Sequence, residues 1–583
     1  MIKRMLRWLV RTAVILIVFG IISHFVKWWS HRVAPGSVIE LALKGPVIER
    51  GTDGLRGLVD ENRTPLNVAR RALREAADDP RIVGLAIRIT DPEMEFAQAQ
   101  ELSALIRGFA AHHKWTTAYL ESAGDFDSGN LPYLVAAAAG EVSMMPEGEI
   151  ELMGVRLQEL FARGLFDKVG IRPNFAAIGK YKSAANIFTE KDFTAAQREE
   201  DEALAGGLFD QLVATAAGER HLEPAQLRAL IDQAPLSAKA GLKAHLIDRI
   251  EYGDEFTDRV KAWSGHDHEI VKYSDYKQVP LLPHLGHRDS IAVVYADGAI
   301  QEGQGGFDPL LSPGGDAVGS DDLVEALDQA RDDDSVRAVV LRINSPGGSV
   351  IASELIRRAA ELLAKEKPLV VSMSGYAASG GYWIAMPAEK IFAEPATITG
   401  SIGVLGGKFN IAPLLTSIGV NGAAIAHGAN ATMFDAFADF TPAQQHLFRD
   451  QLLGETYQHF VNLVAKQRGL TPTRVDQIAQ GRVWTGAEAV KLKLVDGIGG
   501  LDEAIKAARK LAKIPEDTKL GTVELPAPPG LFKSLMKGNL GNDGALRTGI
   551  SAQLRAMVWM LNAAAGAHGG WLRAVLCPVA PVI

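Results

Sequence analysis

The sequence predicts an α/β protein built from two tandem domains, and three observations support this fold class. The first is an internal repeat, because DPRIVGLAIRIT at residues 79–90 matches DDSVRAVVLRIN at residues 333–344 without a gap. The second is the length of 583 residues, which exceeds what one hydrophobic core normally contains. The third is the alternation of β-branched runs with helical patterns inside each repeat, which is typical of an α/β fold.

A second pair of matching segments shows how far the repeat extends. Residues 177–197 match residues 424–444, and both segments end in DFT-x-AQ. Repeats of this length are whole domains, because the units of a solenoid usually contain only ~20–50 residues. We therefore predict an N-terminal domain over residues 37–275, a C-terminal domain over residues 288–510, and a linker with an extension over residues 511–583.

The second repeat shows the alternation of elements most clearly. Its pattern predicts a strand, a helix, a strand, a helix and a strand over residues 290–300, 320–333, 336–344, 352–367 and 368–375. We expect Ser320 or Asp321 to cap the first helix, because their side chains accept hydrogen bonds from free N–H groups. Residues 365–368 end the second helix, since proline cannot continue it.

Composition excludes several classes of partner and site. A net charge of −8 and a pI near 6.0 provide no basic field for nucleic acid. The single cysteine, Cys577, cannot form an intrachain disulfide or a cysteine-rich zinc site. His266 and His268 lack a third ligand at a suitable spacing. We predict no nucleic-acid partner, no metal and no cofactor.

The N-terminus predicts an uncleaved membrane anchor. A basic segment at residues 1–11 precedes an apolar run at residues 12–29, and snorkelling Lys27 with flanking tryptophans extends the run toward the ~20 residues that a spanning helix needs. The alternative is a cleaved signal peptide, whose only small-residue site, Ala34, is followed by Pro35. The excess of positive charge before the run predicts a single pass through the cytoplasmic (inner) membrane, with the N-terminus inside and the body on the periplasmic side.

Residues with catalytic potential gather where strands of the second repeat end. NSPGGS, residues 344–349, follows a strand and precedes a helix, so the N–H groups of its glycines can face an oxyanion. SGYAASGGYW, residues 374–383, places Ser379 near a helix N-terminus, where negative charge is stabilised. Each string alone is also typical of a turn that packs a helix on a sheet, and SPGG recurs at residues 312–315 without a preceding strand.

A serine nucleophile needs a base, and the histidines lie in polar linkers or helix ends. Lysine can replace histidine where burial lowers its pKa. GKYKSAA, residues 179–185, places Lys182 among small residues at the end of a strand. Taken alone, this segment is more typical of a solvated loop lysine.

Together these segments resemble one family, signal peptide peptidase A or protease IV in its long tandem-repeat form. The resemblance covers most of the chain and rests on four motifs in the family's order: GKYKSA at 179–184, NSPGGS at 344–349, AASGGYW at 377–383 and TGSIGV at 399–404. It implies two Clp-protease or crotonase-like α/β domains. No metal or cofactor is implied.

The resemblance also implies a role for individual residues. Ser379 is expected to be the nucleophile and Lys182 the general base of a Ser-Lys dyad. Gly380 and Gly348 are expected to donate N–H groups to the oxyanion, and Ser401 to hydrogen-bond the lysine. The implied substrates are cleaved signal peptides and other hydrophobic or unfolded peptides, and the implied assembly is a homo-oligomer, with a tetramer expected. Two alternatives stay open: a membrane-tethered scaffold without activity, and a crotonase-like acyl-CoA enzyme.

The two repeats have lost complementary parts of this constellation. Alignment of the repeats places Asn130 opposite Ser379 and sets residues 90–95, which contain no glycine, opposite NSPGGS. Lys182 in turn stands opposite Ala429. Each repeat keeps what the other lacks, which predicts one site assembled from residues of both repeats.

Overall fold

The structure is a computed structural model that describes most of both repeats. The described residues are 33–51, 62–124, 128–264, 270–276, 289–307, 316–516, 518 and 520–526. The predicted anchor at residues 12–29, the basic segment before it, and most of the extension at residues 511–583 lie outside them. Within the described ranges, no helix is both long enough and apolar enough to cross a membrane.

The chain forms two compact units. Unit 1 contains residues 1–154 and 212–288, and unit 2 contains residues 155–211 and 289–583. The segment 155–211 belongs to the first repeat in sequence but to unit 2 by its contacts. Lys182 and Ser379 are therefore parts of the same unit.

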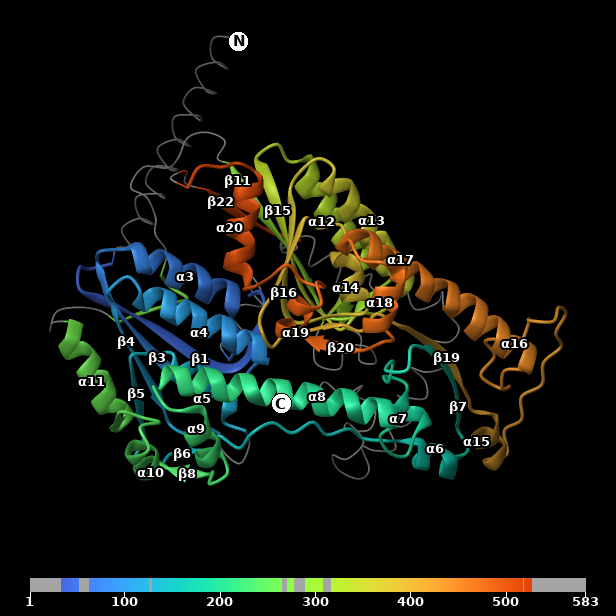
Figure 1. Cartoon of the computed structure of the whole chain (residues 1–583), viewed down its shortest axis with the longest axis horizontal. Coiled ribbons are helices and arrows are strands. Elements are labelled where there is room, and N and C mark those ends of the chain that lie inside the picture. Colours follow the sequence, from blue (N-terminus) through green and yellow to red (C-terminus); the bar gives the residue numbers. More distant parts are fainter. Residues whose placement is uncertain are drawn as a thin grey trace, which may run out of the picture. The chain divides into compact units, whose positions relative to one another are not determined.

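Unit 1 is built on a parallel sheet in the order β10-β1-β3-β4-β5-β9. Its strands are β1 (Ser37–Ile48), β3 (Ile82–Glu93), β4 (Trp115–Leu120), β5 (Glu141–Met144), β9 (Arg249–Ile250) and β10 (Ile270–Lys272), with β2 (Thr64–Pro65) beside β1. Helices α3 (Leu66–Asp78), α4 (Phe96–Ala110) and α5 (Asn130–Ala137) lie side by side in Figure 1. Helix α11 (Gly253–Ser264) packs Phe256 and Val260 against Ala86 and Tyr119.

The rest of unit 1 consists of short elements and one long helix. Strands β6 (Glu149–Ile150) and β8 (Leu236–Ser237) pair antiparallel. The remaining helices are α8 (Ala195–Glu219), which begins in unit 2, α9 (Pro224–Ile231) and α10 (Ala238–Lys243). The buried side chains of α8 in unit 1 include Leu212, Val213 and Ala216, so this end of the helix belongs to the core of unit 1.

Unit 2 repeats the same design, with the parallel order β22-β11-β15-β16-β17-β21. Its strands are β11 (Ser290–Asp297), β15 (Val336–Ser345), β16 (Leu369–Ala378), β17 (Lys390–Ala393), β21 (Gly497–Ile498) and β22 (Gly521–Leu525). Strand β18 (Ile398–Gly400) extends β16, and β20 (Val483–Thr485) pairs antiparallel with β18. A small second sheet contains β12 (Ile300–Gln301), β13 (Gly306–Phe307) and β14 (Asp316–Gly319).

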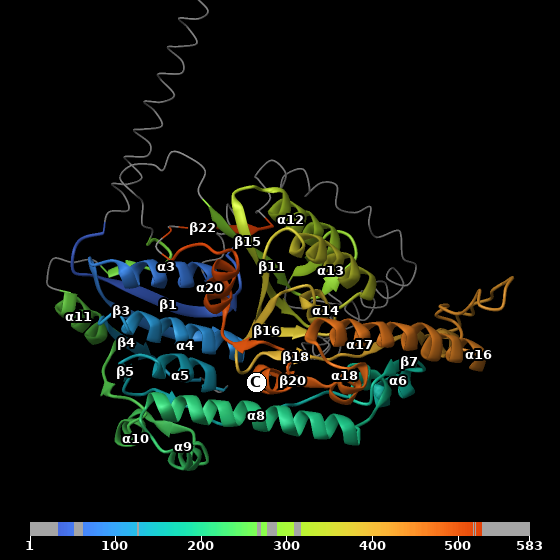
Figure 2. The ribbon, with the colours of Figure 1, turned by 45° about the horizontal axis from the view of Figure 1, so that its top comes forward.

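Alternate side chains along the β-strands of unit 2 pack into two apolar layers, one on each face of the sheet, as expected for a sheet that is covered on both faces. Val294 and Leu341 face the layer under α12 (Ser320–Asp332), α13 (Val350–Ala364) and α14 (Gly380–Ala385), whereas Val293 and Val340 face α20 (Leu501–Leu511). Figure 1 and Figure 2 show α12, α13 and α14 on one side of this sheet and α20 on the other. The prediction of two tandem α/β domains is confirmed.

One predicted helix cap is wrong. Helix α12 begins at Ser320, and its N-cap is Gly319 rather than Ser320 or Asp321. The Ser320 hydroxyl instead accepts a hydrogen bond from the N–H of Gly303 at 3.1 Å. A contact with a distant loop has thus replaced the local cap that the sequence pattern favoured.

A two-stranded antiparallel ribbon extends unit 2, formed by β7 (Arg172–Ile178) and β19 (Val404–Asn410). Phe175 and Phe409 meet edge to face at its centre, with ring centroids 5.1 Å apart. The helices beyond the sheet are α6 (Arg163–Val169), α7 (Asn186–Thr189), α15 (Ala412–Ser417), α16 (Pro442–His446), the π-helix Leu447–Leu453, α17 (Gly454–Arg468), α18 (Pro472–Ile478) and α19 (Gly486–Lys491). The ribbon joins a strand of the first repeat to a strand of the second repeat.

Candidate active site

Ser379 stands at the junction between β16 and α14 in a conformation that few non-glycine residues adopt. Its φ is 53° and its ψ is −115°, a sparsely populated region that costs about 1–3 kcal/mol and requires support from the surroundings. The support comes from both sides: its N–H donates to the Gly400 carbonyl at 2.9 Å, and its carbonyl accepts from the Trp383 N–H at 2.9 Å. The turn leaves Ser379 partly exposed.

Lys182 follows the ribbon strand β7 and is held by a tight turn. Gly179 has a φ of 110°, and a Cβ there would stand 2.4 Å from the Gln480 carbonyl carbon, so only glycine fits. The N–H of Tyr181, two residues further on, donates to the Gln480 carbonyl at 2.8 Å. These contacts fix the start of the segment that carries Lys182.

The ammonium group of Lys182 lies against two serines. Its Nζ donates to Ser379 Oγ at 3.0 Å, to Ser401 Oγ at 2.9 Å and to the Ser401 carbonyl at 3.1 Å. Ser401 also has a positive φ, 49°, and its N–H donates to the Arg482 carbonyl at 2.8 Å. The structure therefore brings together three of the predicted residues, Ser379, Lys182 and Ser401.

The surroundings of Lys182 favour its neutral form. Burial lowers the pKa of Lys182 to about 8, and the nearby Glu200 carboxylate opposes that decrease. An unperturbed lysine has a pKa of about 10.4 and is almost fully protonated at pH 7. The lowered pKa gives Lys182 a larger neutral fraction near neutral pH, as a general base requires.

The two predicted oxyanion donors, Gly348 and Gly380, lie next to each other. A Cβ on Gly380 would stand 3.2 Å from the Gly348 nitrogen, and one on Gly347 would stand 2.6 Å from the Gly380 nitrogen. The loop is pinned by Ile300, whose N–H donates to Gly347 and whose carbonyl accepts from Ser349. Neither Gly348 nor Gly380 uses its N–H in a hydrogen bond to another described residue, so both N–H groups are available to an oxyanion.

Sequence reasoning missed two glutamates on α8, Glu199 and Glu200. Their carboxylates accept hydrogen bonds from the loop behind Lys182, which contains Arg482 and Val483. The Glu200 side chain is 4 % exposed and accepts a hydrogen bond from the Val483 N–H at 2.5 Å. Burial raises the pKa of Glu200 to about 8. Glu199 accepts hydrogen bonds from Tyr181 and Arg482, each at 2.8 Å. The run of acidic residues on a helix carried no signal for this role, because such runs usually face solvent.

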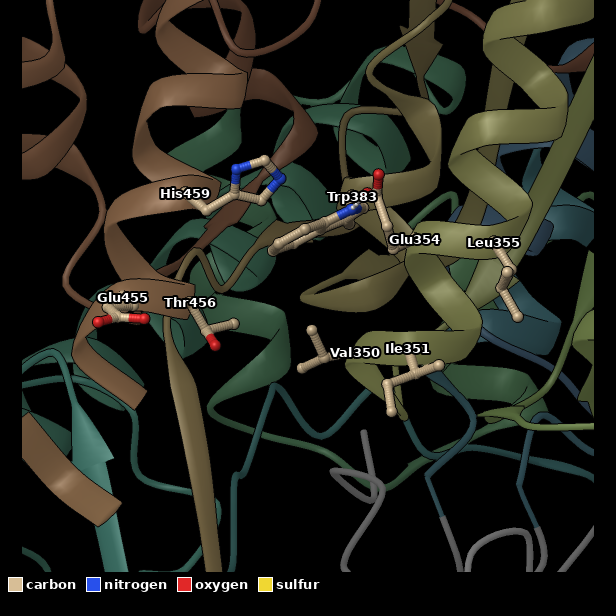
Figure 3. A pocket seen from close by; sticks show the side chains of 8 residues that line it. All are labelled: Val350, Ile351, Glu354, Leu355, Trp383, Glu455, Thr456 and His459. Carbon is tan, nitrogen blue, oxygen red and sulfur yellow. Dashed lines mark hydrogen bonds between the residues drawn. The ribbon is translucent and has the colours of Figure 1, made fainter. Parts of the chain in front are cut away.

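A hollow of about 440 Å³ is lined in part by Trp383, on the helix that begins directly after Ser379 (Figure 3). Its wall is formed by residues of α13, α14 and α17: Val350, Ile351, Glu354, Leu355, Trp383, Glu455, Thr456 and His459. Figure 3 shows the α13 and α17 side chains on opposite sides with Trp383 between them. Trp383 donates from Nε1 to Glu354 at 2.9 Å, whereas Ile351 is 61 % exposed. The hollow therefore offers apolar surface next to the helix that begins after Ser379.

The described residues contain no group of three or more His, Cys, Asp or Glu side chains arranged to hold a metal ion. His266 and His268, weighed above as a metal pair, lie outside the described residues, as does Cys577.

Comparison with known proteins identifies the family. Residues 122–265 and 361–515 match Peptidase family S49. The chain belongs to peptidase family S49. This membership confirms the resemblance to signal peptide peptidase A, or protease IV, and shows that the protein is a serine protease rather than a scaffold or an acyl-CoA enzyme.

Relatives that match over most of their length support the same assignment. The chain is 32 % identical over 534 residues to Serine protease SPPA, chloroplastic, of Arabidopsis thaliana, covering 88 % of this chain and 76 % of the relative. It is 34 % identical over 467 residues to Protease 4 of Salmonella typhi, covering 76 % and 72 %. Protease 4 of Haemophilus influenzae is 31 % identical over 468 residues, covering 77 % and 73 %. The similarity therefore extends over both repeats.

Proposed function

We propose that this S49 serine protease cleaves peptide bonds with a Ser-Lys dyad formed by Ser379 and Lys182. The observation that carries the proposal is the 3.0 Å hydrogen bond from Lys182 Nζ to Ser379 Oγ. This distance is within the reach that a base needs to take the proton of a nucleophile. The lowered pKa of Lys182 supports the same roles.

The mechanism follows from these positions. Neutral Lys182 takes the hydroxyl proton of Ser379, and Oγ attacks the carbonyl carbon of the peptide bond. The N–H groups of Gly348 and Gly380 stabilise the oxyanion, while Ser401 holds the ammonium group in place. Collapse of the intermediate breaks the C–N bond, and the leaving amine takes the proton from Lys182. Water then attacks the acyl-enzyme with Lys182 again as base, which releases the new carboxyl end and restores Ser379.

The proposed substrates are cleaved signal peptides and other hydrophobic or unfolded peptides. The hollow in Figure 3 supports this class, because Val350, Ile351 and Leu355 present apolar surface in a hollow that is also lined by Trp383, on the helix that begins directly after Ser379. Covering such surface with an apolar side chain contributes roughly 25 cal/mol per Å². Folded proteins keep their apolar side chains inside, so an apolar hollow favours unfolded segments.

We further propose the setting implied by the sequence. Residues 12–29 anchor the protein in the cytoplasmic membrane by a single pass, with the catalytic body on the periplasmic side. The domains span residues 37–275 and 288–510, both of the Clp-protease or crotonase type, and the chain assembles into a homo-oligomer, with a tetramer expected. Basic residues before the apolar run and the family resemblance support these points.

Hydrolysis of a hydrophobic signal peptide by the detergent-purified full chain tests the dyad. We expect Ser379→Ala and Lys182→Ala each to lower kcat by about 10³-fold or more, because members of such a unit act together. Lys180→Ala is the matched control, since Lys180 is exposed and lies only two residues from Lys182. Wild-type rates in either folded dyad variant would disprove the dyad.

A further inference from the structure

The loop behind Lys182, residues 480–483, packs directly on the proposed base. A Cβ on Gly481 would stand 2.5 Å from the Lys182 backbone nitrogen, so no side chain fits between the two residues. The Gln480 carbonyl, one residue earlier, accepts the N–H of Tyr181 at 2.8 Å. Any displacement of this loop would therefore displace the backbone of Lys182.

The same loop also supports the serine that holds the ammonium group of Lys182. The Arg482 carbonyl accepts the N–H of Ser401 at 2.8 Å, and the Gly481 N–H donates to the Ile402 carbonyl at 2.9 Å. The Ser401 hydroxyl in turn accepts from Lys182 Nζ at 2.9 Å. The loop thus fixes both ends of the lysine side chain, its backbone and its charged group.

Gln480 holds this loop in a backbone conformation that few residues other than glycine adopt. Its φ is 55°, in the left-handed region, which requires support from the surroundings. Its side chain supplies that support, because Nε2 donates to Asp476 Oδ1 at 2.6 Å and to the Tyr457 hydroxyl at 3.1 Å. The Tyr457 hydroxyl donates to the same carboxylate oxygen at 2.6 Å. We call Tyr457, Asp476 and Gln480 the glutamine clamp.

The glutamine clamp ties the loop to two helices of unit 2. Tyr457 lies on α17, where it is 8 % exposed, and its hydroxyl also accepts from the Gln480 N–H at 3.4 Å. Asp476 lies on α18, which ends two residues before Gln480. A hydrogen-bonded network whose members are all satisfied makes its part of a structure rigid. The clamp therefore restrains the loop that carries Gly481 and Arg482.

The first repeat cannot form this clamp. Arg220 and Arg468 align the repeats here, because each donates to the carboxylate of an aspartate 28 residues further on. The alignment sets Phe209, Arg228 and Asp232 opposite Tyr457, Asp476 and Gln480. A phenylalanine has no hydroxyl, and an arginine accepts no hydrogen bond. The helices are common to both repeats, whereas the clamp belongs to the loop that packs on Lys182.

We propose that Gln480 is a positioning residue of this protease, which holds Lys182 in place through Tyr457 and Asp476. The inference rests on the proposed dyad, because it assigns the effect of the clamp to the base. In this role the clamp keeps Lys182 Nζ 3.0 Å from Ser379 Oγ. Misplacement of a reacting group by about 1 Å can slow a reaction by about 10²-fold.

Hydrolysis of the hydrophobic peptide by the full chain in detergent, with urea unfolding in parallel, tests this role. Gln480→Gly permits the left-handed backbone and deletes the side chain of the clamp, so it should lower kcat by about 10–100-fold at unchanged KM. The matched control is Gln477→Gly, at an exposed position of α18. A glycine inside a helix should lower the resistance to urea and leave kcat unchanged. The same result in Gln480→Gly would overturn the proposal.

A conservative variant separates geometry from charge. Asp476→Asn keeps an oxygen that can accept from Tyr457 and Gln480, so its kcat should stay close to that of the wild type. Asp476→Ala removes the acceptor and should lose kcat as Gln480→Gly does. Equal losses in the two Asp476 variants would mean that the carboxylate acts through its charge, and the proposal would be wrong.

The pH profile reports on Lys182 itself. Burial lowers the pKa of Lys182, so a loop that admits water should raise this pKa and move the midpoint of kcat/KM against pH upward in Gln480→Gly. Glutamine and glycine are both uncharged, so Glu200 on α8 and Arg482 in the loop keep their charges beside the lysine. A midpoint that stays at the wild-type value would show that Lys182 has not moved, against the proposal.

Lys182→Ala in the same series separates this inference from the dyad on which it rests. Loss of activity in Lys182→Ala beside a wild-type rate in Gln480→Gly would overturn the positioning role alone. A wild-type rate in Lys182→Ala would disprove the dyad and the positioning role with it. Loss of activity in both variants, with the upward midpoint in Gln480→Gly, is the expected result.

Discussion

The two units share their framework but not their chemistry. In unit 1 the Tyr133 hydroxyl donates to the Leu246 carbonyl at 2.8 Å, and in unit 2 the Tyr382 hydroxyl donates to the Leu494 carbonyl at 2.8 Å. In both units a lysine side chain also donates to backbone carbonyls at the C-terminal end of a helix. Lys114 donates to the carbonyls of Ala76 and Asp79 at the end of α3, and Lys367 donates to those of Ala330 and Asp333 at the end of α12. Bonds that hold helices on the sheet are therefore duplicated.

The difference begins where the two central strands end. In unit 1, β3 continues past Asp91 and still pairs with β1, with Glu93 opposite Pro46. In unit 2, β15 ends at Ser345, and Gly347 and Gly348, both with positive φ, turn away into a loop. This loop carries Gly348, a proposed oxyanion donor, and is called the oxyanion loop below. Asn130, opposite Ser379 in the alignment, uses its side-chain amide to donate to Gly154 at 2.6 Å. Unit 1 therefore has an amide that donates a hydrogen bond at the position where unit 2 has the proposed nucleophile, Ser379.

Of the variants that compare the two units, the largest effect is expected at the oxyanion loop. Gly347→Ala places a Cβ 2.6 Å from the Gly380 nitrogen, at a φ of 104° that side chains rarely adopt. Displacement of that donor should lower kcat by ~10²–10³-fold. Hydrolysis of the hydrophobic peptide measures it. The repeat counterpart, Glu93→Ala, changes an exposed side chain and should leave kcat unchanged. Equal losses in both variants would contradict the assignment of catalysis to unit 2.

The shared tyrosines provide a test of intermediate size. Tyr133→Phe and Tyr382→Phe each leave a buried carbonyl without its hydroxyl donor, which should cost about 1–3 kcal/mol of unfolding free energy in either unit. Urea unfolding measures these costs. Only Tyr382→Phe should also lower kcat, by about 10-fold or less, because Tyr382 lies on α14 one turn after Ser379. A similar loss of activity in Tyr133→Phe would show that the units are coupled in catalysis.

The sequence predicted the repeated framework because strands and helices leave local patterns. Residues 290–300 and 336–344 were expected to form strands, and β11 and β15 lie there. It also predicted which residues meet in the candidate site, since the motifs around Lys182 and Ser379 are specific in combination. The contacts that hold the loop behind Lys182 could not be predicted from the sequence. Arg482 and Val483 reach Glu199 and Glu200 only through tertiary packing, which no spacing along the chain reports.

The smallest expected effect concerns that loop and the charge beside Lys182. The base must be neutral, so the rate should rise with pH and reach half its maximum near the Lys182 pKa of about 8. The Glu200 carboxylate raises this pKa by stabilising the ammonium form. Glu200→Gln removes the charge while the amide oxygen can still accept from Val483. The midpoint of kcat/KM against pH should therefore move down, by a fraction of a unit.

A control separates charge from structure. Glu202→Gln alters an exposed carboxylate on the same helix and should leave the midpoint where it is. The Glu200 pKa is itself raised to about 8, so the carboxyl is only partly ionised at the midpoint, and the shift stays small for that reason. A midpoint that rises in Glu200→Gln would mean that the carboxyl acts on Lys182 through the position of the loop rather than through its charge. A midpoint that stays constant while kcat falls would lead to the same conclusion. In that case the carboxyl of Glu200 would act only by holding the loop next to Lys182 in position, and its charge would not affect the pKa of Lys182.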